Sequence, residues 1–361
     1  MDWEEVTLKD IAFYRNEKVK CDKLSFDSYI STENMVLDRG GVTLASSLPT
    51  TGSSNIYFKA DILVSNIRPY FKKIWFADKT GACSNDVLVF AIKNEKIDAS
   101  YLYYKLSTDN FFDYVMSGSN GVKMPRGNKK SIMDYKLLLP PLKTQKKIAN
   151  ILSNYDQLIE NNNQRIKLLE SMAEEIYKEW FVRLRFPDYE KVEKLNWNRK
   201  RLNDICKFFN GKSAVNSEDG KYPIYGANGI IGSNHNYNYE NIIIIGRVGI
   251  YCGNVFHIKE KCWATDNTII IQANEDDILF LKYYLQFKNL NNYAGGSAQP
   301  LLTQTQIKSL VVDYPSKQLI KNFNTILQPM DKEIGNLIEK NKNLKETRDL
   351  LLPRFINGKV M

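Results

Sequence analysis

One short segment of this chain carries three closely spaced side chains of types that bind metal ions. Cys252, His257 and Cys262 follow one another with the spacing C-x4-H-x4-C. This is not a usual ligand spacing for structural zinc, although thiolates and imidazoles are its usual ligands. The three residues also stand in sequence typical of β-strands. We therefore interpret them as buried core residues and predict no metal site.

Two short motifs resemble parts of catalytic or nucleotide-binding sites. In "PDYEK", Asp188 and Glu190 resemble a pair of nuclease carboxylates, but a two-carboxylate metal site needs ligands from separate strands and these two are almost adjacent. The motif "NGKS" (residues 210–213) resembles the end of a phosphate-binding loop, but Cys206 stands where that loop has its first glycine. Neither motif supports a catalytic site.

Glycines and histidines give no better evidence for catalysis. Gly246, Gly249 and Gly253 fit neither nucleotide-binding pattern, and we interpret them as marking a tight turn between strands. His235 and His257 are the only histidines, so general bases are few. We therefore predict no catalytic residue and no cofactor in this chain.

The overall composition favours a polyanionic partner. The formal net charge is +9 and the pI is about 9.0, which suggests nucleic acid most simply. No apolar run approaches the ~18 to 20 residues of a membrane span, and the acidic N-terminus has no apolar signal core. Five irregularly spaced cysteines without a CxxC pair are typical of reduced thiols. We expect a cytoplasmic protein.

Residues suited to contact DNA gather in a few segments. Lys and Arg contact phosphates and so position a protein, whereas Arg, Lys, Asn, Gln and Ser contact base edges and so specify a sequence. Any one of these residues alone could be a solvated loop residue, but their clustering in duplicated positions favours binding. The candidates are Arg68, Tyr70, Lys72 and Lys73 in "NIRPYFKK", Lys123, Arg126, Lys129 and Lys130 in "GVKMPRGNKK", Asn228, Ser233, Asn234, His235 and Asn236 in "ANGIIGSNHNYNY", and Arg247 and Gln299 in the matching loops.

The elements that position these candidates occur twice along the chain. "WEEVTLKDIAFYRNEK" at the start is matched by "WNRKRLNDICKFFNGK" from Trp197, and "KADILVSNIRPYFKKIWF" is matched by "YENIIIIGRVGIYCGNVF". Each half then has a Gly/Ser turn, a short strand, a proline and a long helix. This conserved order predicts a duplicated scaffold whose two copies have different targets.

Each half is predicted to be a mixed α+β domain with a curled sheet. Short β-branched or aromatic runs bounded by Gly, Asn, Asp and Pro predict the strands. Helical apolar spacing predicts one helix from Asp98, its N-cap, to residue 116, and another from Asp277. The strands are expected at residues 60–66, 72–77, 86–92, 135–140, 241–246, 254–258, 267–273 and 309–314.

The helix behind each half carries an unbroken heptad pattern with steps of three and four residues. A single surface helix rarely keeps a 3.5-residue period this long, so the pattern favours a coiled coil over two unrelated amphipathic helices. The first apolar stripe is Ile148, Leu152, Tyr155, Ile159, Asn162, Ile166, Leu169, Ala173, Ile176 and Trp180, and the second is Phe323, Leu327, Met330, Ile334, Leu337, Asn341, Leu344, Arg348, Leu351 and Phe355.

The two asparagines predict the direction and register of the pair. In an antiparallel alignment Asn162 faces Asn341, so two buried amides can satisfy each other. In a parallel alignment each asparagine faces an aliphatic residue instead. Alternatively, Asn162 turns to solvent. We predict antiparallel helices that act as a ruler, because the first stripe is ~50 Å long at 1.5 Å per residue and one turn of DNA is ~34 Å.

Taken together, these features resemble the specificity subunit of type I restriction–modification enzymes. The resemblance covers nearly the whole chain and rests on "LPPLKTQKKIANILSNYDQLIENNNQ", the ending "LLPRFINGKV" and "YPIYGANGIIGSNHNYNYENIIIIGRVGIYCGNV…WATDN". It implies two pseudo-symmetric target recognition domains (residues 1–141 and 197–315), separated by two conserved helical regions (residues 142–196 and 316–361).

The resemblance also implies partners. Each domain is expected to bind one half of a split, asymmetric sequence in double-stranded DNA. The helices are expected to dock methyltransferase subunits, two in number, to which restriction subunits add. S-adenosylmethionine, ATP and Mg are then expected on those partner subunits.

Two other hypotheses remain open on sequence grounds. One is a self-contained DNA methyltransferase or nuclease, although "LPPL" has Leu139 and Leu142 where an amino-methyltransferase would carry Asp or Asn and an aromatic residue. The other is a structural scaffold held by its coiled coil. Methylation by the isolated chain would support the first, and an absence of salt-dependent DNA binding would support the second.

Overall fold

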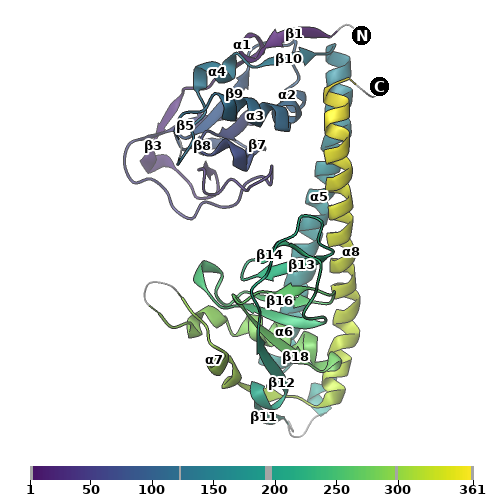
Figure 1. Ribbon diagram of the computed structural model, residues 1–361. Helices are drawn as coiled ribbons and strands as arrows, with labels where there is room; N and C mark the ends of the chain where they lie inside the picture. Colours follow the sequence, from purple (N-terminus) through teal and green to yellow (C-terminus); the bar gives the residue numbers. More distant parts are fainter. Residues whose placement is uncertain (1–2, 122, 192–196, 297–299, 359–361) are drawn as a thin grey trace. The chain divides into compact units, whose positions relative to one another are not determined.

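The computed structural model describes residues 3–121, 123–191, 197–296 and 300–358. The chain divides into two compact units: unit 1 comprises residues 1–162 and 339–361, and unit 2 comprises residues 163–338. The long helices α5 (Leu142–Tyr177) and α8 (Lys317–Ile356) contribute to both units (Figure 1). Within the described residues, no helix has the length and apolar character needed to cross a membrane.

The globular part of unit 1 contains three sheets. A two-stranded sheet has the order β1-β10, and two four-stranded sheets have the orders β2-β9-β6-β7 and β3-β5-β8-β4. Short helices connect and cover them. The elements are β1 (Glu4–Thr7), α1 (Leu8–Ile11), β2 (Ala12–Tyr14), β3 (Lys18–Lys20), η1 (Cys21–Lys23), β4 (Tyr29–Ile30), β5 (Ser53–Tyr57), β6 (Ile62–Ser65), η2 (Pro69–Phe71), β7 (Ile74–Phe76), β8 (Gly81–Cys83), β9 (Val87–Ile92), α2 (Ala99–Leu106), α3 (Asp109–Ser117), α4 (Lys129–Met133) and β10 (Lys136–Leu139).

Unit 2 has the same kind of architecture. Its sheets have the orders β11-β19, β12-β18-β15-β16 and β14-β13-β17. The elements are a π-helical turn (Lys178–Val182) that continues α5, η4 (Tyr189–Lys191), β11 (Asn198–Arg201), η5 (Leu202–Asp204), β12 (Cys206–Asn210), β13 (Tyr222–Gly226), β14 (Gly229–Asn234), β15 (Ile242–Gly246), η6 (Gly249–Tyr251), β16 (Val255–Ile258), β17 (Trp263–Ala264), β18 (Thr268–Ala273), η7 (Glu275–Asp277), α6 (Ile278–Phe287), η8 (Leu290–Tyr293), α7 (Gln304–Lys308) and β19 (Val311–Tyr314).

Continuous apolar runs form the central strands because both faces of these strands are buried. In β15, Ile243 and Ile245 pack in the core that contains the helices, whereas Ile242 and Ile244 pack in a second core with Tyr225 of β13. The same alternation occurs in β9 of unit 1, where Leu88 and Phe90 face one core and Val87 and Val89 face another. Each central sheet is therefore a middle layer between helices and a second sheet.

The predicted repeat is confirmed by topology. β9 pairs with β2 and β6, and β6 pairs with β7, all antiparallel. β18 pairs in the same way with β12 and β15, and β15 pairs with β16. In both units the first strand pairs with the strand that precedes the long helix. The two domains thus share one plan although their sequences differ.

The two long helices pair antiparallel. In unit 1, Leu152 near the start of α5 shares a core with Leu352 near the end of α8. In unit 2, the ring of Trp180 at the far end of that helical segment lies 5.8 Å from the ring of Phe323 near the start of α8. Every member of the two heptad stripes is buried or partly buried, whereas most of the residues that flank them are exposed. The α+β fold class with antiparallel coiled-coil helices is confirmed.

Polar groups interrupt the stripe at defined places. Nδ2 of Asn162 donates to Oδ1 of Asn341 at 2.9 Å, so the two amides meet as the antiparallel alignment requires. One heptad away in unit 1, Asp156 accepts a 2.5 Å hydrogen bond from Tyr104 of α2 and a 2.5 Å bond from Arg348 of α8. This half-buried carboxylate links the globular part of unit 1 to both helices.

Three expectations about secondary structure were wrong. The curled sheet is in fact three separate sheets in each unit, because alternate residues of the central strands belong to different cores. The single helix from Asp98 is α2 and α3, because the hydroxyls of Ser107 and Thr108 bond the last carbonyl groups of α2 and end it. Residues 222–234, taken as a loop from Ala227 onward, form the hairpin β13–β14 with its turn at Ala227–Asn228.

The asparagine pair gives a test of register. We expect Asn162→Leu to lower the free energy of unfolding by about 1 kcal/mol, because the buried Asn341 amide loses a hydrogen bond. The double variant Asn162→Leu/Asn341→Leu should recover stability, because both polar groups are then removed. Thermal melting followed by circular dichroism measures both. Additive losses in the double variant would show that the two amides do not act as a pair.

Candidate nucleic-acid interface

Two segments of unit 1 cross and are held together by their backbones. We name residues 66–73, which follow β6, together with residues 118–121 and 123–128 the first loop pair. The amide of Arg68 donates to the carbonyl of Pro125 at 2.8 Å, and the amide of Gly127 donates to the carbonyl of Asn66 at 3.2 Å. Main-chain bonds therefore fix the crossing independently of the side chains that it carries.

Unit 2 contains the same construction. We name residues 247–254, which follow β15, together with residues 294–296 and 300–302 the second loop pair. The amide of Gly249 donates to the carbonyl of Pro300 at 3.0 Å, and the amide of Leu302 donates to the carbonyl of Arg247 at 2.8 Å. Each bond has its counterpart in the first loop pair, so Arg68 corresponds to Gly249 and Asn66 corresponds to Arg247.

The first loop pair holds two cations in left-handed backbone conformations. Arg68 has φ 49° and Lys72 has φ 50°, and both lie beside η2. The corresponding residues of the second loop pair are Gly249 and Gly253, with φ 71° and 91°. Left-handed backbone costs a residue with a side chain roughly 1–2 kcal/mol more than it costs glycine. Unit 1 thus keeps Arg and Lys where stability alone favours glycine, which is typical of a functional site.

The predicted residues of the first segment differ in exposure and in whether their side chains already have a partner. Arg68 is exposed, and Tyr70 is 47% exposed beside Phe71. The ammonium group of Lys72 lies 2.7 Å from Asp109 of α3. The ammonium group of Lys73 donates to the carbonyl of Thr32 at 2.6 Å, and burial lowers its pKa. Arg68 and Tyr70 are therefore better placed to contact a ligand than the two lysines.

The second segment of the first loop pair adds more positive charge. Lys123 is exposed, and Arg126 is half-exposed with a nitrogen 3.3 Å from Asp86. Lys129 and Lys130 are exposed in the first turn of α4. The backbone bond from Arg68 to Pro125 brings the predicted clusters "NIRPYFKK" and "GVKMPRGNKK" together. Unit 1 therefore has one basic surface built from two segments.

In unit 2 the structure brings Asn228 close to the second loop pair. Asn228 is exposed at the tip of the β13–β14 hairpin. The adjacent Ala227 lies against Gly246, because a Cβ atom added to Gly246 would be 2.8 Å from the carbonyl oxygen of Ala227. Arg247, which follows Gly246, is partly exposed. Gln299 lies outside the described residues.

The other candidates of that hairpin lie at its opposite end. Asn234 is the sixth and last residue of β14, which begins directly after the turn. It is 8% exposed and caps the next turn by accepting from the amide of Asn236. The hydroxyl of Ser233 donates to the carbonyl of Ser217. His235 and Asn236 are exposed, and the His235 ring lies 3.3 Å from Asp219. The sequence cluster "ANGIIGSNHNYNY" is thus divided between the two ends of a hairpin.

One residue of the first loop pair was not considered in the sequence analysis. Asn66 corresponds to Arg247 but was not among the predicted contacts. Aligning "VSNIRPYF" with "IGRVGIYC" places Asn66 opposite Arg247, so the repeat itself carried the signal. It was overlooked because Asn66 directly follows a buried strand and has no charge.

The cysteines and His257 are accounted for by packing. Cys252 and Cys262 are buried, and burial raises the pKa of Cys262 to about 12. Burial lowers the pKa of His257 to about 4, and its Nε2 lies 3.1 Å from Oδ1 of Asn241. Among the described residues, no three His, Cys, Asp or Glu side chains are arranged to hold a metal ion.

The glycines that resembled nucleotide-binding motifs also have structural roles. Gly246 is the last residue of β15, and Gly249 and Gly253 lie in the predicted turn between β15 and β16. Gly211 of "NGKS" passes so close to the backbone that a Cβ there would lie 1.9 Å from the carbonyl oxygen of Thr265. Close backbone approach, rather than a phosphate, therefore explains this glycine.

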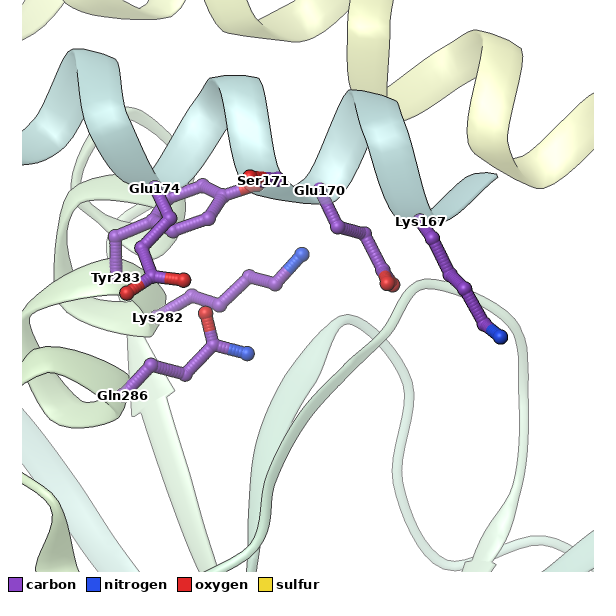
Figure 2. A pocket seen from close by; sticks show the side chains of 7 residues that line it. All are labelled: Lys167, Glu170, Ser171, Glu174, Lys282, Tyr283 and Gln286. Atoms are coloured by element: carbon purple, nitrogen blue, oxygen red, sulfur yellow. The ribbon is translucent and has the colours of Figure 1, made fainter. Parts of the chain in front are cut away.

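A polar cavity of about 440 Å³ lies between α5 and α6 in unit 2. Figure 2 shows Lys282 extending from α6 along α5, with Glu170 and Glu174 on either side of it. Burial lowers the pKa of Lys282, and its ammonium group lies 3.7 Å from Asp331 of α8. This cluster of opposite charges links α6 to both long helices, much as Asp156 does in unit 1.

Comparison with known proteins identifies relatives along the whole chain. The family model described as "Type I restriction modification DNA specificity domain" matches residues 1–171 and 194–346. The MjaIX specificity subunit of Methanocaldococcus jannaschii is 24% identical, over 91% of this chain and 84% of that protein. The HindI specificity subunit of Haemophilus influenzae is 22% identical, over 99% of this chain and 100% of that protein.

A solved structure shares the fold. The S subunit of a type I restriction–modification system from M. genitalium superimposes with a TM-score of 0.61. The match covers 99% of this chain and 96% of that chain at 19% identity.

Thiol reactivity tests the packing interpretation of Cys252 and Cys262. At pH 8 a thiol with a pKa of about 12 is only ~10⁻⁴ ionised, so we expect Cys262 and the buried Cys252 to react with a thiol reagent only after unfolding. The partly exposed Cys21 should react in the native protein. Chelator treatment should not change this pattern. Release of zinc together with new reactive thiols would contradict it.

Proposed function

This chain belongs to the type I restriction–modification DNA specificity family, and from that premise we propose that each unit binds one half of a split target in double-stranded DNA. The observation that carries the proposal is the duplicated loop pair. The same backbone crossing occurs in both units with different side chains, as two readers of different sequences require.

The first loop pair supplies contacts of both kinds. Arg68, Arg126 and Lys123 are exposed cations that suit phosphate oxygens or guanine edges. Tyr70 adds an exposed aromatic ring beside them. In unit 2, the amide of Asn228 and the guanidinium of Arg247 offer hydrogen bonds to base edges. The surplus of basic residues supports electrostatic attraction of both units to DNA.

The paired helices are proposed to set the spacing of the two half-sites. α5 has 36 residues and α8 has 40, which correspond to ~54 and ~60 Å at 1.5 Å per residue. A turn of DNA is ~34 Å. An antiparallel pair of this length fits a target whose halves lie a turn or more apart.

The same helices are proposed to dock methyltransferase subunits. Both helices carry large exposed apolar residues that a docked subunit would cover. Leu168 is 61% exposed, Ile338 57% and Leu350 65%. The subunits docked there would carry the chemistry, with S-adenosylmethionine, ATP and Mg bound to them and to the restriction subunits. In this proposal the present chain is non-catalytic and remains in the cytoplasm with its partners.

Two arginines test DNA contact. In the complex reconstituted with its methyltransferase subunits, we expect Arg126→Ala and Arg247→Ala each to weaken binding of target duplex at least several-fold, because each removes one charged contact. Melting temperatures should stay unchanged, since both side chains are at least partly exposed. Lys79→Ala, which alters an exposed turn between β7 and β8, is the matched control. Unchanged affinity for both arginine variants would exclude these loops.

Helix length tests the spacing. One heptad inserted in α5 beside Ile166 and one in α8 beside Leu337, positions that the register places opposite each other, lengthens the pair by ~10 Å. We expect the preferred gap between half-sites to grow by about three base pairs at 3.4 Å each, with unchanged bases in each half. Sequencing of methylated sites measures the gap, and a heptad replaced rather than inserted is the control. An unaltered gap would refute the ruler.

A further inference from the structure

Asn66 and Arg247 occupy the same place in the two repeats. Each follows the last residue of the central strand, β6 or β15, and each donates its amide to the residue before the neighbouring strand, Asp86 at 2.8 Å and Asn267 at 3.1 Å. Each also accepts a bond from the crossing segment through its carbonyl, from Gly127 or Leu302. At this position both the backbone amide and the backbone carbonyl are hydrogen-bonded in each repeat, and only the side chains differ.

Both side chains keep a buried polar atom without a partner. Oδ1 of Asn66 and Nε of Arg247 are two of the five buried side-chain nitrogen or oxygen atoms that lack a hydrogen bond in the described part of the chain. Asn66 is only 7% exposed. An unsatisfied buried group destabilises a protein by about 1–3 kcal/mol. Its occurrence at the same position of both repeats points to a ligand that satisfies it.

The asparagine side chain points into the loop crossing. A Cβ on Gly127 would lie 2.9 Å from Oδ1 of Asn66, so this oxygen faces the opposite segment of the first loop pair. Arg68 and Arg126 flank the crossing on either segment and are exposed. A group that enters here therefore meets an amide in the centre and cations at the rim.

Arg247 is also uncommitted. Within the described residues, its guanidinium group forms no ion pair or hydrogen bond, and the side chain is partly exposed. An arginine without a carboxylate partner retains its whole donor set for a ligand. Guanine presents the two acceptors, O6 and N7, that this fork of donors matches.

We propose that Asn66 and Arg247 determine specificity, with Asn66 reading an adenine in one half-site and Arg247 reading a guanine in the other. The inference rests on the proposed function and adds the bases. An asparagine amide accepts from N6 of adenine and donates to N7, which supplies the bond that Oδ1 lacks. The main-chain bonds Arg68–Pro125 and Gly127–Asn66 hold this oxygen in place between the exposed side chains of Arg68 and Arg126.

The test is the methylated consensus of the complex reconstituted with its methyltransferase subunits. Arg247→Gln exchanges a guanine reader for an adenine reader. We expect the preference for guanine at one position of one half-site to fall at least 10-fold in favour of adenine, with the other half-site unchanged. Asn66→Ser should relax one adenine position of the other half-site by a similar factor. Lys79→Gln, in the exposed turn between β7 and β8, is the matched control and should leave the consensus unchanged.

The outcomes separate this inference from the proposed function. A consensus unchanged by Arg247→Gln and Asn66→Ser, with uniformly weaker methylation, would overturn it, because the residues would then contact phosphates or support the loop. A relaxed position that is not guanine for Arg247, or not adenine for Asn66, would overturn the base assignment. If Asn66→Ser does not fold, by its melting curve, Arg247→Gln decides alone. If the wild-type complex shows no salt-dependent binding and no methylated sites, the proposed function itself fails.

Discussion

The hydrogen bond between Asn162 and Asn341 constrains how the two long helices can pair. A heptad stripe by itself permits sliding in steps of seven residues, because one apolar layer resembles the next. A slide by one heptad would place Asn162 opposite Ile334 or Arg348. The aromatic contact between Trp180 and Phe323 belongs to the same register as the asparagine pair. The length over which α5 and α8 overlap, and every property proposed to depend on it, follows from this one alignment.

Much of this architecture was predictable because its signals are local or periodic. The heptad stripes, the duplicated order of elements and the N-cap Asp98 are visible in the sequence itself. The division of each domain into three sheets was not predictable. Both faces of β9 and β15 are apolar, so the sequence does not indicate which core each face joins. The β13–β14 hairpin was missed although the dipeptide Asn228–Gly229 is a typical hairpin signal. In the structure the two turn residues are Ala227 and Asn228. The many asparagines of "ANGIIGSNHNYNY" suggested a loop instead.

The geometry of the candidate interface was not predictable from the sequence. Sequence identified the cationic segments around Arg68 and Arg126, yet only the fold shows that backbone bonds join them. It grouped Asn228 with Asn234, which the strand β14 separates. Asn66 could not be recognised from its residue type, since its significance depends on burial and on correspondence with Arg247. Long-range pairing and burial are tertiary properties that a short motif does not encode.

The loop pairs are fixed by main-chain hydrogen bonds, and this has a consequence for evolution. Arg68 corresponds to Gly249 and Asn66 to Arg247, so very different side chains already occupy one unchanged crossing. Point substitution at these positions leaves the scaffold's own bonding intact. With the loop pairs as the proposed readers of DNA, a lineage would acquire a new recognition sequence by single mutations in one copy while the other copy keeps its own. The repertoire of targets would then diversify faster than the fold that presents it.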